Sequence, residues 1–288
     1  MKGVNHMFNT SRMELHRMFR TKSFYISLAV NVILIAFLFL VMAPSINKGF
    51  AAAQPDAATS VSQSGEGWKM EMVLDNRSGP NPVNVCAAYM GLCILFVATF
   101  MALFVGRFYK DGFCKNVLGS SGHRFTFPVA QSVCAVVYAA VNITLADAVS
   151  LAFAKLLVNS FTFAYLDVFC LNLLGQFLLL CAVGSFSAFL TSWTRSTIPA
   201  IVYVLLISTN IMSTVIGFLD SHLSDWLHKE VMIEDFLPSL YFSNQFLLDV
   251  SENTKNSAML LHAILLSLAF LVIYNVAGTV LLTRRDVK

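Results

Sequence analysis

The chain alternates between long apolar runs and shorter polar segments. Six apolar runs cover residues 24–43, 84–105, 125–154, 168–194, 196–219 and 257–283. Each is about as long as the roughly 20 apolar residues that a helix needs to cross a bilayer. Strands of a membrane barrel would instead alternate in polarity over about 10 residues. The pattern predicts an all-α polytopic membrane protein with six transmembrane helices, whose backbone groups are satisfied within each helix.

Composition supports this prediction. The 288 residues are 57% hydrophobic and 12% charged, whereas about 25% of the residues in a soluble domain are charged. The chain is therefore expected in a cell membrane. The net charge of +3 is small and gives no reason to expect a nucleic-acid partner.

The basic residues predict the orientation. Thirteen of the 19 Lys and Arg residues fall on one side: Lys2, Arg12, Arg17, Arg20, Lys22, Arg107, Lys110, Lys115, Arg124, Arg195, Arg284, Arg285 and Lys288. Because basic residues near span ends stay cytoplasmic, both termini are predicted to be cytoplasmic. Residues 44–83 and 220–256 are then outer loops, and the six-helix domain occupies residues 24–288.

Residues 1–23 are basic and partly amphipathic. Phe8, Leu15, Met18 and Phe19 share one helical face, and Arg12, Arg17 and Arg20 lie elsewhere. This arrangement favours a helix in the cytoplasmic interface of the membrane. The alternative is an ordinary basic flank that only enforces the orientation.

The cytoplasmic segment 106–124 combines glycines with basic residues, as a phosphate-binding loop does. A P-loop, however, requires Gly-Lys-Ser/Thr, which occurs nowhere in this chain. Phe113, Val117 and Leu118 can instead form a small apolar face of a short helix, which the glycines from Gly119 to Gly122 would end. Such a helix fits a groove on a partner protein.

In its order of elements and in this segment, the chain resembles the permease subunits of the ABC type-2 exporter family. The matching residues are Asp111, Gly112, Lys115, Asn116, Leu118 and Arg124. The resemblance implies that Lys110, Asp111, Gly112, Phe113, Lys115, Asn116, Leu118 and Arg124 couple the chain to a separate ATPase subunit. It also implies a second permease chain, identical or sister, and ATP and Mg²⁺ bound by the ATPase, with no cofactor, metal or catalytic residue in this chain.

The length and the first outer loop are similar to those of permeases for peptide-antibiotic immunity and bacitracin resistance. The resemblance therefore implies ATP-driven export of an amphiphilic substrate, such as a peptide antibiotic, a drug or a lipid-like compound.

Polar residues inside the apolar runs are the other candidates. They are Asp147, Asn142, Gln176 and Asn210. An ionisable group within a span is a functional candidate by default, and amides within spans often hydrogen-bond neighbouring helices. These residues are predicted to belong either to the transport pathway or to polar packing between helices.

The competing hypothesis is a carrier, channel or intramembrane protease that works alone. A protease would pair Ser185 or Ser187 with His262, because the nucleophilic serine needs a base. The segment "VGSFSAF" lacks the expected G-x-S-G order, and small residues such as Gly184 and Ala188 more often mark tight helix packing.

Overall fold

The computed structural model describes residues 2–52, 82–110, 126–158, 161, 166–208, 211–227, 236–238 and 257–284. Within these ranges the regular structure is helical, without any strand. The longer helices are α1 (Lys2–Arg20), α2 (Lys22–Ala52), α3 (Pro82–Lys110), α5 (Thr126–Leu157), α6 (Leu166–Thr194), α7 (Ile198–Ser208), α8 (Ile211–Leu227) and α11 (Ser257–Arg284).

Five of the described helices are long and apolar enough to cross a membrane. The candidate spans are Lys22–Val41, Gly91–Lys110, Thr126–Leu157, Phe169–Thr194 and Leu260–Thr283. They lie in α2, α3, α5, α6 and α11, and they correspond to the first, second, third, fourth and sixth predicted runs. The chain is an all-α, multi-pass membrane protein, as its sequence predicts.

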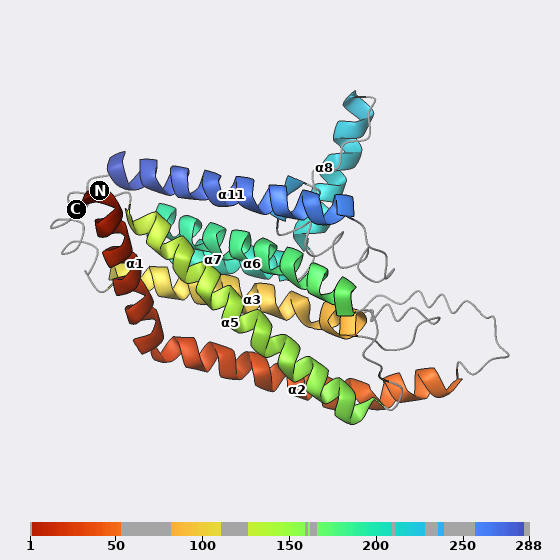
Figure 1. The fold of residues 1–288 in the computed structure, drawn as a ribbon. Helices are drawn as coiled ribbons and strands as arrows, with labels where there is room; N and C mark the ends of the chain where they lie inside the picture. The colour runs from red at the N-terminus through yellow and green to blue at the C-terminus, as the bar shows by residue number, and fades with distance from the viewer. Residues whose placement is uncertain are drawn as a thin grey trace.

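The fifth predicted run, residues 196–219, departs from the expectation of one long helix. It falls on α7 and α8, and residues 209 and 210 between them lie outside the described residues. With 11 residues, α7 is about 16 Å long, about half the thickness of a bilayer core. In Figure 1, α8 points away from the bundle at a steep angle. The single helix expected here is therefore replaced by two shorter ones.

The turn before α7 has a defined local cause. Arg195 has a φ of 55°, which lies in the left-handed region that reverses the chain direction after a helix. The Ser196 hydroxyl then accepts a hydrogen bond of 3.3 Å from the backbone N–H of Ile198, as a helix-capping side chain does. These features end α6 at Thr194 and start α7 at Ile198.

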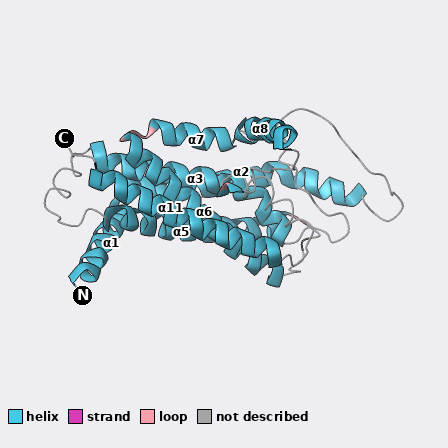
Figure 2. Ribbon diagram, turned by 90° about the horizontal axis from the view of Figure 1, so that it is seen from above, coloured by secondary structure: helices cyan, strands magenta, loops and turns pink. Residues whose placement is uncertain are grey.

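The long helices run side by side in alternating directions (Figure 1). α2 and α5 begin at the same end of the bundle at which α3, α6 and α11 finish, and α1 crosses that end at a steep angle. α7 and α8 lie along one side of the bundle when it is viewed from above (Figure 2). The end crossed by α1 carries Arg107, Lys110 and Arg195, so the predicted basic sidedness corresponds to one physical end of the bundle.

Small residues bring α3, α5 and α6 close together in the core. A Cβ atom added to Gly184 of α6 would lie 3.0 Å from a methyl group of Val97 and 3.3 Å from the Cβ of Ala135. The Ser187 hydroxyl donates a 2.6 Å hydrogen bond to the backbone oxygen of Ala98. Close backbone approach through small residues is the usual way for membrane helices to associate, so Gly184 and Ser187 act in helix packing.

Candidate functional site

The predicted coupling segment is only partly described. Lys110 is the last residue of α3 and is exposed at the basic end of the bundle. The other predicted coupling residues, Asp111, Gly112, Phe113, Lys115, Asn116, Leu118 and Arg124, lie outside the described residues, as does Asn210. Their roles stay predictions, whereas α3, the helix that leads into the segment, is described to its last residue.

The end of α3 contacts the beginnings of three other helices. A Cβ atom on Gly106 would overlap the side chain of Thr197, just before α7. Arg107 donates a 2.7 Å hydrogen bond to the hydroxyl of Ser23, near the start of α2. The Phe108 ring lies 5.6 Å from the ring of Phe127, at the start of α5. We call Phe104, Gly106, Arg107 and Phe108 the α3 junction.

A buried ion pair attaches α1 to the same junction. Glu14 is 1% exposed, and its Oε2 lies 2.7 Å from Nη2 of Arg17. The Arg17 guanidinium lies over two rings of the junction, 4.4 Å from the centroid of Phe104 and 5.3 Å from that of Phe108. A cation over an aromatic face is stabilised by the ring quadrupole. Arg17 therefore links the carboxylate of α1 to the aromatic end of α3.

The environment of Glu14 has opposing electrostatic effects. Burial raises the pKa of Glu14 above its ordinary value, and the charge and hydrogen bond of Arg17 oppose that rise. Removing Arg17 would leave a buried carboxylate with its main compensation lost, which is costly. While Glu14 is buried, Arg17 therefore partly offsets the cost of desolvating its carboxylate.

Sequence reasoning did not identify this pair. In the sequence pattern Arg17 is only one of several basic flanking residues, and the apolar pattern does not single out Glu14. The available signal was that Glu14 is the only acidic residue before Asp56 and precedes Arg17 by three positions, a spacing that places two side chains together on a helix. Its burial depends on α3 and α5, which follow much later in the chain.

A second polar group lies inside the bundle between α2 and α5. The hydroxyls of Ser27 and Tyr138 are 2.8 Å apart, and Asn31 donates a 3.3 Å hydrogen bond to Oδ1 of Asn142 one turn further along both helices. Cys93 of α3 lies beside Asn31. We call Ser27, Asn31, Tyr138 and Asn142 the polar ladder.

The structure places the predicted polar residues of the apolar runs in different parts of the bundle. Asn142 belongs to the polar ladder and is fully buried. Asp147, also on α5, is 6% exposed and acts electrostatically on Cys93. Gln176 is buried on α6, a different helix from those of the ladder. Asn142 thus takes part in polar packing, while Asp147 is a buried acid close to that packing.

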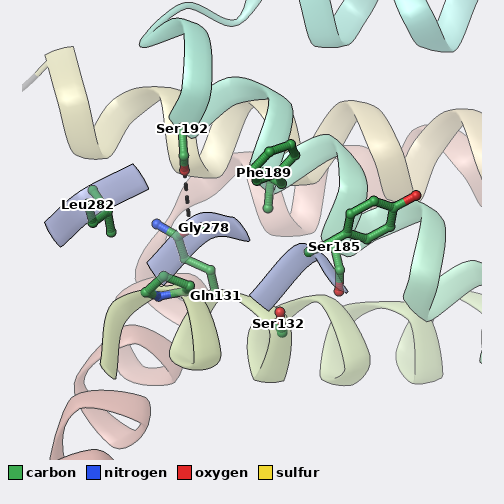
Figure 3. A pocket seen from close by; sticks show the side chains of 10 residues that line it. Gln131, Ser132, Ser185, Phe189, Ser192, Gly278 and Leu282 are labelled. Carbon is green, nitrogen blue, oxygen red and sulfur yellow. Dashed lines mark hydrogen bonds between the residues drawn. The ribbon is translucent and has the colours of Figure 1, made fainter. Parts of the chain in front are cut away.

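A small pocket lies between α5, α6 and α11. Figure 3 shows Ser132 and Ser185 facing it from α5 and α6, with Ser192 donating a hydrogen bond of 3.4 Å to Gln131. Ser132 donates a 3.0 Å hydrogen bond to Asn275 of α11. The pocket volume is about 10 Å³, which accommodates about one water molecule. It is far too small for an amphiphilic substrate.

Ser185 and Ser187 do not lie beside His262, the base that a protease would need. Ser185 lines this pocket together with Tyr274 of α11, whereas His262 lies 12 residues earlier on α11, about 18 Å away along the helix. Ser187 is fully buried and donates to the backbone of α3. Neither serine can transfer a proton to His262 in this arrangement.

No known protein-family model matches this chain, and no curated protein matches it in sequence. The features of this chain that bear on its function are therefore the α3 junction, the basic end of the bundle and the polar residues within it.

Proposed function

We propose that this chain is the permease subunit of an ABC type-2 exporter in a bacterial cytoplasmic membrane. A separate ATPase subunit binds ATP and Mg²⁺, and a second permease chain, identical or sister, completes the transport pathway. The substrate is amphiphilic, such as a peptide antibiotic, a drug or a lipid-like compound. The proposal rests on the family resemblance of the coupling segment and on the contacts of the α3 junction.

The α3 junction is the observation that carries the proposal. A force applied to segment 106–124 would act first on Gly106 and Arg107, which contact Thr197 and Ser23. It would also act on Phe104 and Phe108, which lie under Arg17 of α1. Because packed helices shift between discrete arrangements and transmit strain, closure of the ATPase would move α1, α2 and α7 together with α3.

In this proposal the membrane domain has six crossings and both termini are cytoplasmic. Five crossings are α2, α3, α5, α6 and α11. The sixth is assigned to the fifth apolar run, residues 196–219, of which the 11 residues of α7 supply about 16 Å along the bundle. The basic end that α1 crosses is then the cytoplasmic end.

The polar ladder and Asp147 supply the polar contacts that separate when the helices shift. A buried acid in a membrane domain is a common element of transport pathways. In this proposal Asp147, Gln176 and Asn210 face or adjoin the pathway, and Asn142 holds α5 against α2 in one of the two arrangements.

The experiment is co-purification followed by reconstitution. The tagged full-length chain is isolated from its own cells, its stoichiometric ATPase is identified, and both are placed in vesicles with a fluorescent amphiphilic peptide. We expect ATP-dependent transport by the complex and none by the chain alone. Transport or cleavage by the pure chain would overturn the proposal.

A double variant tests the coupling assignment. Lys115→Glu with Phe113→Ala should abolish both assembly with the ATPase and ATP-dependent transport, because it alters the charge and the apolar face of the coupling helix. Lys155→Glu, at the opposite end of α5, is the matched charge control and should retain both activities. If the double variant also retains both, the coupling segment has been assigned incorrectly.

A further inference from the structure

Helix α1 presents three different faces. Thr10, Glu14 and Met18 are buried against the bundle. Phe8 and Phe19 are 65% and 42% exposed, so the face predicted for Phe8, Leu15, Met18 and Phe19 is divided, with Met18 buried and the two phenylalanines exposed. The basic residues Arg12 and Arg20, with His16 between them, occupy the adjoining exposed strip. We call Phe8, Arg12, His16, Phe19 and Arg20 the outer face of α1.

The outer face carries basic charge, and α1 itself places no carboxylate on this face. Glu14 is the only acidic residue of α1, and it is buried against the bundle and paired with Arg17. Arg12 and Arg20 are exposed, and Lys22 follows them at the exposed start of α2. The charge of this face is therefore complementary to an anionic surface.

The aromatic edge of this face continues onto the membrane-facing side of α2. Phe19 contacts Phe24 with ring centroids 5.2 Å apart, and Phe24 contacts Tyr25 at the same distance. Tyr25 and Ile26 are 58% and 60% exposed at the start of a candidate membrane span. Exposed residues on such a span contact lipid, and aromatic side chains concentrate at the boundary between headgroups and acyl chains.

We propose that the outer face of α1 binds the headgroups of anionic phospholipids. Arg12 and Arg20 pair with lipid phosphates, while Phe8 and Phe19 insert at the boundary with the acyl chains. A cytosolic protein partner explains the basic strip but not its aromatic continuity with α2, and so a lipid is the occupant that the observations favour. The bound lipid holds α1 in the plane in which Glu14 and Arg17 engage the α3 junction.

Lipid binding to the full-length chain in detergent tests this proposal without any ATPase. Short-chain phosphatidylglycerol and short-chain phosphatidylcholine are titrated separately, and bound lipid is measured by native mass spectrometry. We expect the wild type to prefer phosphatidylglycerol. Replacing both arginines, Arg12→Gln with Arg20→Gln, should weaken that binding about 30-fold, because each basic residue near an anionic lipid contributes a factor of about five.

The matched control is Lys155→Gln with Arg195→Gln, which also removes two exposed positive charges but leaves α1 intact. It should keep the lipid preference of the wild type. Circular dichroism and thermal unfolding of both double variants verify that they are folded to the same extent. An equal loss in both double variants would mean that only net charge matters, and would overturn the proposal.

Two further outcomes would also overturn it. If millimolar inorganic phosphate displaces phosphatidylglycerol completely, the face is a simple anion site. If the double arginine variant keeps its lipid preference but loses a copurifying ATPase, the face belongs to the protein partner. A second variant, Phe8→Ser with Phe19→Ser, should weaken binding of longer-chain phosphatidylglycerol, which reaches the acyl boundary, more than binding of the short-chain lipid.

Discussion

Helices α3 and α11 are nearly identical in hydropathy and differ in their place in the bundle. Within each candidate span, an 18-residue window has a mean hydropathy of 2.1 in α3 and 2.2 in α11, yet 67% of the α3 window is buried and only 17% of the α11 window. In water the more apolar helix would be the more buried one. In a bilayer, lipid tails are as apolar as leucine, and so hydropathy does not distinguish an inner helix from an outer one.

Small and polar residues account for the difference. α3 meets α6 where Ala98 accepts the hydrogen bond of Ser187 and where Gly184 leaves space for Val97. α11 instead exposes large apolar side chains on its outer side, including Val272 and Val276. The inner position of α3 thus follows from close contacts that it makes, and the following variants test this comparison.

The largest effect is expected at the attachment of α1 to the inner helix. Arg17→Leu leaves the Glu14 carboxylate buried without its partner and should lower the free energy of unfolding by about 3 kcal/mol. This value is at the low end of the range for breaking a buried ion pair, because Arg17 is partly exposed. Unfolding in mixed micelles measures it. The double variant Glu14→Leu with Arg17→Leu removes both charges and should recover most of the loss; no recovery would contradict a role for the uncompensated carboxylate.

The next effect is expected from steric overpacking of the inner helices. Gly184→Leu should cost about 1–3 kcal/mol, since Val97 and Ala135 already lie against the backbone of Gly184. Gly91→Leu on α3 is the control, because nothing lies within 4 Å of a Cβ atom at that position. Equal losses of thermal stability in the two variants would show that the α3–α6 contact is not close.

Inner and outer hydrogen bonds can be compared by double-mutant cycles. The cycle of Asn31→Ala and Asn142→Ala should give a coupling energy of about 1 kcal/mol, within the range for hydrogen bonds between membrane helices. The cycle of Ser132→Ala and Asn275→Ala, between α5 and the outer helix α11, should give about half of that because this pair is only partly buried. A larger coupling energy for Ser132 and Asn275 than for Asn31 and Asn142 would contradict the expectation that the inner hydrogen bond is the stronger one.

The smallest effect is expected on the exposed side of α11. Val272→Ala on α11 should change the free energy of unfolding by less than about 0.5 kcal/mol, as exposed substitutions usually do. The same substitution at Val97, which is fully buried on α3, should cost about 1 kcal/mol or more. Thermal unfolding of the two variants measures the difference directly, and similar values would contradict the assigned positions of the helices.

Part of the candidate site was predictable and part was not. The basic end and Lys110 follow from local charge, and the structure places Lys110 at the end of α3. The pair of Asn31 and Asn142 was foreseeable only as two polar residues in separate runs, since nothing local indicates which helices meet. The attachment of Glu14 and Arg17 to Phe104 was not foreseeable, because it depends on where α1 crosses the bundle.

The sequence by itself determined the class of the protein, its helices and the uneven distribution of its basic residues. These properties are local: an apolar run of sufficient length forms a helix in lipid because each backbone group finds its partner within the same helix. Only the tertiary structure decided which helices are inner, that residues 196–219 belong to two helices, and that Glu14 is buried. These features depend on close contacts between residues far apart in the chain, for which hydropathy carries no signal.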